Sequence, residues 1–431
     1  MIILKDARKA DRKDSRVTET VAGILEMVRK NGDRTLIELT RRYDGVELKK
    51  IRVSRSEIEK AYAQTAPETV ANIRFAAGRI RDFAARQLAC LQPLEYAGIP
   101  GVTLGHQLIP VSSCGVYVPG GRYPLPSSAL MGIIPARVAG VKRIAACSPP
   151  AGAFGGIHPA VLVAMDLAGA DEIYCMGGAQ AVAAYAYGTE SISPVDLVVG
   201  PGNRFVTEAK RQLCGQVGID LLAGPSEVLI IADESVSPRL VAVELLAQCE
   251  HDPASAAVLV TTSRKLAEQV VRAMEEELLT LETAGLASQA WTDNGKIILV
   301  ESLEEAVAVA DRVAPEHLLV QTCRNDELAA ALRNYGSLFI GGFATVAFGD
   351  YVSGPNHILP TMGSARFSSG VWAGTFIKVV PYQKVTARGA AALAGPCACL
   401  AGVEGLPAHR RAAELRRFAA ATNRPTNIDK I

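Results

Sequence analysis

The amino-acid sequence predicts an α/β protein with two lobes, each built around a parallel sheet. Between residues 112 and 235, short apolar runs ending in glycine or proline alternate with helical stretches. They recur at a spacing of about 25 to 30 residues, which is typical of βα units in a parallel sheet. A second series of runs follows residue 226. The expected strands are residues 115–118, 143–148, 172–176 and 196–199 in the first series, and 228–232, 257–260, 297–300, 317–320 and 337–340 in the second.

Length and composition narrow the class of protein. The 431 residues suffice for two or three domains, and a hydrophobic content of 49% suits a large core. A net charge of +1 argues against nucleic acid or an anionic membrane as the main partner. We find no 18-residue apolar run and no basic leader before an apolar core, so we expect no membrane span and no signal peptide. The nine scattered cysteines, without a CxxC pair, predict a reduced, cytoplasmic protein.

The two ends of the chain differ from the middle. Residues 1 to about 90 read as helices, with a stop signal at Gly32 and a capping box over residues 54–57. From residue 372 an alanine-rich stretch and a basic helix form a tail that we expect to have no core of its own. The predicted division is an N-terminal segment (1–15), a first lobe (16–114 with 229–371), a second lobe (115–228) and the tail (372–431).

One helix end carries candidate metal ligands. Residues 240–246 suit a helix that Pro253 should end. Gln248 and His251 are three residues apart, so they share a face of its last turn. An amide oxygen and an imidazole on one face are potential ligands of a divalent metal. The alternative is a polar helix end at which His251 is solvated or caps the helix.

Further candidates lie in the second half of the chain. Glu316 and His317 adjoin each other just before an apolar strand, an arrangement suited to acid–base chemistry or, alternatively, to a solvated pair after Pro315. Residues 349–357 should form an irregular polar loop, which carries Asp350. Gln248, His251, Asp350 and His409 are together candidate ligands of a Zn²⁺ site with open positions, although spacing alone does not prove that they converge.

Two glycine turns follow strands in the first series. Residues 177–180 and 200–203 each join a strand to a helix, which would bring a dinucleotide close to backbone amides at a helix start. Neither fits the pattern GxGxxG with an acid about 20 residues later. Ordinary βα turns are the alternative.

These motifs resemble the histidinol dehydrogenase family from about residue 15 to residue 420. The matching stretches are residues 116–121, 177–181, 199–203, 223–227, 247–253, 314–318, 349–360 and 406–409. The resemblance implies Rossmann-like lobes in an intertwined homodimer that depends on Zn²⁺ and NAD. It also implies roles for individual residues. These are metal ligation by Gln248, His251, Asp350 and the partner subunit's His409, NAD contacts from Tyr117, Gln180 and Asn203, substrate contacts from Ser226, His317, His357 and Glu404, and catalysis by Glu316 and His317.

The implied reaction oxidises an alcohol to a carboxylate in two NAD-dependent steps. Zn²⁺ orients the polar end of the substrate, and His317 takes the hydroxyl proton as hydride leaves for NAD⁺. Water activated by Glu316 then adds to the bound aldehyde, and the hydrate loses a second hydride. Because neutral imidazole is the required form of His317, activity should rise as the pH passes its pKa.

Some positions depart from the histidinol-oxidising pattern. Val346 stands where those members often carry a glutamate, and residues 366–378, with Trp372, look more like sulfopropanediol dehydrogenase, as do residues 121–123. Ser226, Glu227 and Glu404 look like the histidinol type. We therefore expect oxidation of L-histidinol to L-histidine, in histidine biosynthesis, with 2,3-dihydroxypropane-1-sulfonate as the alternative substrate. An anionic substrate would need basic groups, for which Arg122, Arg366 and Lys378 are candidates.

A third hypothesis is a binding or regulatory protein on a former enzyme scaffold. The presence of all six candidate metal-binding and catalytic residues argues against this hypothesis, since a protein that no longer catalyses the reaction has no need of them. They are Gln248, His251, Glu316, His317, Asp350 and His409.

Overall fold

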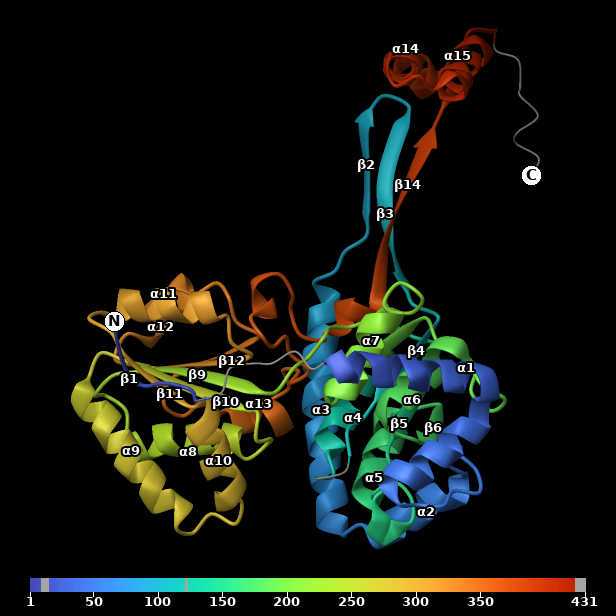
Figure 1. Cartoon of the computed structure of the whole chain (residues 1–431). Helices are drawn as coiled ribbons and strands as arrows, with labels where there is room; N and C mark the ends of the chain where they lie inside the picture. Colours follow the sequence, from blue (N-terminus) through green and yellow to red (C-terminus); the bar gives the residue numbers. More distant parts are fainter. Residues whose placement is uncertain (9–14, 121–122, 423–431) are drawn as a thin grey trace. The chain divides into compact units, whose positions relative to one another are not determined.

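The computed structural model describes residues 1–8, 15–120 and 123–422. The chain divides into two compact units (Figure 1). The larger unit comprises residues 1–88 and 111–376, and the smaller comprises residues 89–110 and 377–431. Two parallel sheets form the frame of the larger unit, as the spacing of apolar runs predicts.

A six-stranded sheet contains the second series of expected strands. Its order is β1 (Ile2–Lys5), β11 (Lys296–Leu299), β10 (Ala256–Thr261), β9 (Glu227–Ala232), β12 (His317–Gln321) and β13 (Ser337–Ile340). The last five strands are parallel, and β1 adds an antiparallel edge that the sequence analysis did not expect. A four-residue edge strand carries too short an apolar pattern to be recognised by itself.

Helices cover both faces of this sheet, so its strands are buried on both sides. Val228 and Ile230 of β9 face the core with α8 (Pro238–Cys249), α9 (Arg264–Leu278) and α10 (Ala284–Asn294). Leu229 and Ile231 face the opposite core with α11 (Leu303–Val313) and α12 (Asn325–Ala331). The two helical layers are visible above and below the sheet in Figure 1. Burial on both faces explains why these strands read as continuous apolar runs rather than alternating ones.

The first series forms a five-stranded parallel sheet. Its order is β6 (Glu172–Cys175), β5 (Arg143–Ser148), β4 (Ser113–Tyr117), β7 (Leu197–Val199) and β8 (Gly218–Ile219). Its helices are α4 (Pro126–Ala139), α5 (Pro159–Ala168), α6 (Gly178–Tyr187) and α7 (Arg204–Leu213). The order runs outward in both directions from β4, and the expected α/β architecture with parallel sheets is confirmed for both series.

The N-terminal helices are α1 (Ser15–Asp44), α2 (Arg55–Gln64) and α3 (Pro67–Ala89). Of these, α1 packs on α6 and α7, and α2 packs on α5. Gly32 interrupts α1 with φ of 51°, and the expected capping box opens α2, where the Ser54 N–H donates to Glu57 Oε2 over 2.8 Å. The buried side of α1, which includes Val21 and Leu36, shares a core with α6 and α7. This packing differs from the expected grouping of residues 16–114 with residues 229–371, because the apolar side of α1 meets the first series of βα units.

The smaller unit contains a separate antiparallel sheet of β2 (Leu94–Ile99), β3 (Val102–Pro110) and β14 (Ile377–Val385). It continues into α14 (Ala387–Val403) and α15 (Pro407–Thr422), which pack against each other. Within α14 only Gly389, Ala394 and Ala401 are buried, which agrees with a segment that has no large core. No helix in the described ranges is long and apolar enough to cross a membrane.

Candidate active site

The central residues of the site begin two neighbouring strands. Glu227 opens β9 and His317 opens β12, and His317 pairs in register with Val228. The side chains of Glu316 and His317 are only 6% and 4% exposed. These residues therefore lie at the amino ends of the strands, as expected for a Glu–His pair just before an apolar strand. Since α8 runs antiparallel to the strands, as a crossover helix does, its last turn reaches the same edge.

The two nitrogens of His317 have different surroundings. Nδ1 lies 3.2 Å from the backbone oxygen of Glu227 and 3.6 Å from Glu316 Oε2. A carbonyl oxygen only accepts, so Nδ1 carries the proton in that contact and Nε2 is the basic nitrogen of the neutral ring. Nε2 is buried without a hydrogen-bond partner in the described chain and lies 3.6 Å from Asp350 Oδ1. This arrangement suits a general base, because the Nδ1 contact orients the ring and Nε2 remains able to accept a proton.

Burial and neighbouring charges adjust both members of the adjacent pair. Burial raises the pKa of Glu316 to about 7, because the charged carboxylate is poorly solvated there. Burial alone would lower the pKa of His317, but Glu316, Asp350 and the Glu227 carbonyl outweigh it and raise the pKa to about 9. Glu316 Oε2 also accepts from the Glu227 N–H over 2.8 Å. The carboxyl group is thus held in place and is able to exchange a proton near neutral pH.

Asp350 comes from the short helix α13 (Val346–Tyr351), so the expectation that residues 349–357 are irregular is wrong for the first three of them. The ring of His357 donates from Nδ1 to the backbone oxygen of Asp350 over 3.0 Å. Its Nε2 accepts from the Ser128 hydroxyl over 3.1 Å. Burial lowers the pKa of His357, which agrees with a neutral ring in these two contacts. The structure therefore brings His357, Asp350 and His317 together.

The candidate metal ligand Gln248 lies in the last turn of α8, and His251 follows two residues after the helix ends. Gln248 is 3% exposed, and its side-chain nitrogen has no hydrogen-bond partner among the described residues. His251 is exposed, and its charge acts on both Asp350 and His357. α13 packs on α8, where Val346 joins the core beside Leu245 and Cys249. Gln248 and Asp350 thus approach the same region with unsatisfied polar atoms.

These atoms fit a divalent cation. Asp350 Oδ1 is an acceptor without a donor in the described structure, and the amide of Gln248 presents an oxygen as readily as a nitrogen. Burial would raise the pKa of the Asp350 carboxyl, but the nearby imidazoles of His317, His357 and His251 lower it below its ordinary value. Among the described residues of one chain, no three His, Cys, Asp or Glu side chains form a metal cluster. A metal bound here would therefore need the Gln248 amide and at least one further ligand that is not among these side chains.

Two predicted site residues belong to the smaller unit. His409 lies in the first turn of α15, and Glu404 follows the end of α14. Both side chains are exposed.

The predicted cofactor residues lie at a strand end and at two helix starts of the five-stranded sheet. Tyr117 ends β4 and its hydroxyl accepts from the Gly178 N–H over 3.1 Å. Gly178, at φ of 67°, packs so closely on Gln180 that an added Cβ would lie 2.7 Å from Gln180 Oε1. Asn203 caps α7, where its Oδ1 accepts from two backbone N–H groups at 3.0 and 3.2 Å. These loops form glycine turns at helix starts, which suit the phosphates of a dinucleotide.

Sequence reasoning missed two carboxylates. Glu227 Oε1 accepts from the Met362 N–H over 3.0 Å, so the residue next to the predicted Ser226 ties a second loop to the site. Glu244 lies on α8 four residues before Gln248, and its Oε2 accepts from the Val346 N–H over 3.4 Å. Burial raises the pKa of both groups. The helical spacing 244, 248, 251 was a signal for Glu244, whereas the role of Glu227 depends on strand register.

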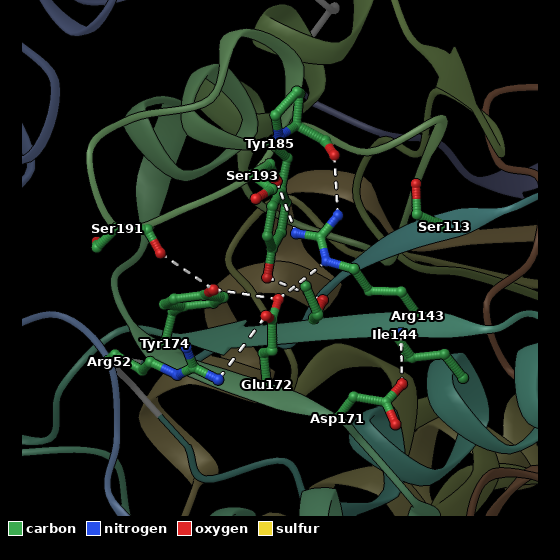
Figure 2. A network of polar contacts seen from close by, with 12 residues as sticks. Arg52, Ser113, Arg143, Ile144, Asp171, Glu172, Tyr174, Tyr185, Ser191 and Ser193 are labelled. Atoms are coloured by element: carbon green, nitrogen blue, oxygen red, sulfur yellow. Dashed lines mark hydrogen bonds and ion pairs between the residues drawn. The ribbon is translucent and has the colours of Figure 1, made fainter.

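A second polar cluster lies at the amino ends of the five-stranded sheet (Figure 2). We call it the edge network and define it as Arg52, Arg143, Glu172 and Tyr174. Arg143 donates to Glu172 over 3.1 Å and to two backbone oxygens over 2.9 and 2.7 Å. Tyr174 donates to Glu172 over 3.1 Å, and Arg52 lies 3.7 Å from that carboxylate. Each charged group here has a partner of opposite charge.

Comparison with known proteins identifies the family. A family model described as histidinol dehydrogenase matches residues 7–417. The chain belongs to the histidinol dehydrogenase family. It is therefore an NAD-dependent oxidoreductase, as the resemblance implied.

Similar proteins match over nearly their full length. The histidinol dehydrogenase of Methanothermobacter thermautotrophicus is 49% identical over 389 residues, which are 90% of this chain and 91% of that protein. A histidinol dehydrogenase homolog of Shouchella clausii is 47% identical over 410 residues, or 95% and 96% of the two chains. The crystal structure of histidinol dehydrogenase from Elizabethkingia anophelis has a TM-score of 0.91 at 37% identity, and covers 96% of this chain and 94% of that one.

Proposed function

We propose that this chain is a zinc-dependent dehydrogenase that oxidises L-histidinol to L-histidine by two successive hydride transfers to NAD⁺ through a bound aldehyde. The observation that carries the proposal is the oriented and unpartnered Nε2 of His317, buried beside Asp350. In this proposal the lobe of residues 115–228 binds NAD through Tyr117, Gln180 and Asn203. The lobe that contains residues 229–371 carries the reacting groups.

The metal would be held by Gln248, His251 and Asp350 of one chain and by His409 of the partner subunit. We infer the partner because the described residues of a single chain supply too few ligands for a four-coordinate zinc site. The active form is then a homodimer, in which Glu404 also reaches the substrate across the interface. When bound, the ion supplies positive charge that orients the substrate's polar end and favours loss of its hydroxyl proton.

The residues of this chain supply the proton transfers. His317 accepts the hydroxyl proton at Nε2, while its Nδ1–H stays on the Glu227 carbonyl and fixes the ring. Glu316, whose pKa burial raises to about 7, accepts a proton from the water that attacks the aldehyde. Ser226 and His357 contact the substrate, and the neutral ring of His357 is held by Ser128 and the Asp350 backbone.

The charges around the site favour a cationic substrate over a sulfonate. Glu227, Glu244 and Glu316 are all carboxylates whose electrostatic fields reach His317. Arg366, a candidate for holding an anion, instead donates to the backbone oxygens of Gly363 and Arg312. Lys378 belongs to the smaller unit, and Arg122 lies outside the described residues. Val346, which provides no carboxylate of its own, is the feature that keeps the sulfonated diol as second candidate.

The test is NADH formation by the zinc-loaded enzyme with L-histidinol and with 2,3-dihydroxypropane-1-sulfonate, side by side. We expect two NADH per histidinol and slow or no turnover of the sulfonate. Removal of zinc by a chelator should abolish the reaction, and added Zn²⁺ should restore it. Turnover of the sulfonate alone would replace the substrate, and turnover that survives complete metal removal would contradict the zinc site.

A further inference from the structure

One buried ion pair holds both polar groups of a single glycine in the loop of residues 200–203. The Lys210 ammonium donates to the Gly200 backbone oxygen over 2.6 Å and to Asp220 Oδ1 over 2.5 Å. The other carboxylate oxygen, Asp220 Oδ2, accepts from the Gly200 N–H over 2.8 Å. Gly200 is therefore fixed from both sides by charged groups, whose hydrogen bonds are the stronger kind.

The pair is almost completely removed from solvent. The side chains of Lys210 and Asp220 are 2% and 0% exposed. Their remaining contacts are with Leu221, whose N–H donates to Asp220 Oδ1 over 2.6 Å and whose oxygen accepts from Lys210 over 3.4 Å. Burying two charges costs free energy that their attraction only partly offsets, so a buried pair is a poor source of stability. A role in fixing one conformation explains its position better.

Gly200 in turn packs the loop of residues 200–203 closely against Tyr117, another predicted cofactor residue. Its φ of 117° is open only to glycine, and an added Cβ would lie 2.1 Å from the Tyr117 backbone oxygen. The loop thus packs directly on the end of β4. Three residues later Asn203 starts α7, and Lys210 itself lies on that helix. The ion pair therefore connects the loop of residues 200–203 to α7 through Lys210 and to the end of β8 through Asp220. These segments form one rigid unit.

We propose that Lys210 and Asp220 are positioning residues for the cofactor, which hold residues 200–203 against Tyr117 in the form that receives NAD before NAD arrives. This inference rests on the proposed location of NAD at Tyr117, Gln180 and Asn203. Neither side chain is required to touch the cofactor. The pair acts through the Gly200 peptide, and preorganisation of this kind raises affinity by lowering the ordering cost of binding.

The experiment compares double variants that leave no unpaired buried charge. Lys210→Met/Asp220→Leu removes both charges and both hydrogen bonds to Gly200. Lys210→Met/Asp220→Asn removes the charges but keeps a side-chain oxygen for the Gly200 N–H. The matched control is Arg143→Met/Glu172→Leu, which deletes a partly buried ion pair of the edge network from the same sheet. NADH affinity is measured by fluorescence titration, with kcat, KM for NAD⁺ and the melting temperature alongside.

The Met/Leu variant should raise the dissociation constant of NADH and the KM for NAD⁺ about tenfold or more, with kcat at saturating NAD⁺ little changed. The Met/Asn variant should recover most of this loss. The control should lower the melting temperature without weakening NADH binding. A Met/Leu variant that folds and binds NADH like the wild type overturns the proposal, and so does an equal loss of NADH affinity in the control.

A measurement on the unaltered enzyme covers the case in which the Met/Leu and Met/Asn variants do not fold. The Gly200 amide should exchange slowly with deuterium before NADH is added, and fast exchange in the cofactor-free enzyme overturns the proposal. Wild-type enzyme that fails to bind NADH at all would instead contradict the proposed function.

Discussion

The two parallel sheets of the larger unit each carry a charged cluster at the amino ends of their strands, and the clusters differ in how far their polar atoms are satisfied. In the edge network, Glu172 accepts hydrogen bonds from Arg143 and Tyr174, each over 3.1 Å (Figure 2). In the candidate active site, Nε2 of His317 and Oδ1 of Asp350 face each other at 3.6 Å, and neither has a hydrogen-bond partner in the described chain. Unsatisfied atoms, rather than charge alone, distinguish the reactive cluster.

The physical reason is the cost of leaving a buried polar group without a partner. Each such group lowers the free energy of unfolding by about 1–3 kcal/mol. A protein that retains several of them in one place therefore uses them for a purpose other than stability. The edge network avoids this cost, since each of its charged groups has a partner of opposite charge. The candidate active site keeps buried polar atoms without hydrogen-bond partners in the described chain, which a bound ligand could satisfy.

His317→Asn should lower kcat by about 10²–10⁴, because the amide cannot accept the substrate proton. The melting temperature should change little, since the asparagine still donates to the Glu227 carbonyl. NADH production by zinc-loaded enzyme measures the loss. His106→Asn, which alters a half-buried histidine of the smaller unit, is the control and should retain wild-type activity. A loss below tenfold in His317→Asn would remove this residue from the role of base.

The rate should depend on pH through the same residue. The raised pKa of His317 means that the neutral, proton-accepting form becomes dominant only above its ordinary value of 6.5, towards about 9. We expect kcat/KM to increase by roughly one to two orders of magnitude over that range. A flat pH–rate profile, measured at constant ionic strength and zinc occupancy, is the opposite outcome.

Glu172→Ala should destabilise the protein without affecting the chemistry. It leaves Arg143 and Tyr174 without their shared acceptor, at a cost of about 1–3 kcal/mol, which corresponds to a melting temperature lower by several degrees. Glu304→Ala removes the acid of an exposed ion pair with Arg324 and should change the melting temperature very little. If Glu172→Ala lowers kcat more than its melting temperature explains, the edge network is not purely structural.

The smallest change in melting temperature is expected at Asp44, a carboxyl group that belongs to neither cluster. The side chain of this last residue of α1 has no hydrogen bond or ion pair within the described structure, and burial raises its pKa to about 6 from 3.8. A raised carboxyl pKa contributes stability below pH 3.8, and that stability is lost as the pH rises through about 6. Asp44→Asn should therefore melt about 1–3 °C higher than the wild type at pH 8 and at nearly the same temperature at pH 4. An equal or lower melting temperature at pH 8 would show that the ionised carboxylate has a stabilising partner.

The sequence was informative wherever the pattern is local. All strands of the two parallel sheets except β1 and β8 were predictable, because each is a continuous apolar run bounded by turns. Gln248 and His251 were selected because they are three residues apart at a helix end. Glu316 and His317 were found because they are adjacent. The contacts of Glu227, Ser128 and Lys210 depend on strand register or on packing between distant segments, which no local pattern reports.

The smaller unit was missed for a related reason. Every residue of β2 is exposed, so the strand has no buried face to create an alternating pattern. Its neighbour β3 obtains most of its pairing from β14, far along the chain. The packing of α1 on the five-stranded sheet was likewise hidden, because an amphipathic helix shows that it has a buried side but not which sheet it covers.

The pairing of β3 with β14 also sets an order of events during synthesis. Residues 102–110 leave the ribosome early, yet their nine-residue partner, residues 377–385, is made only after both sheets of the larger unit are complete. Until then β2 and β3 form a lone hairpin, which is marginally stable in water. The sheet of the smaller unit therefore cannot be completed until residues 377–385 are made, and Glu404 and His409 join the chain later still.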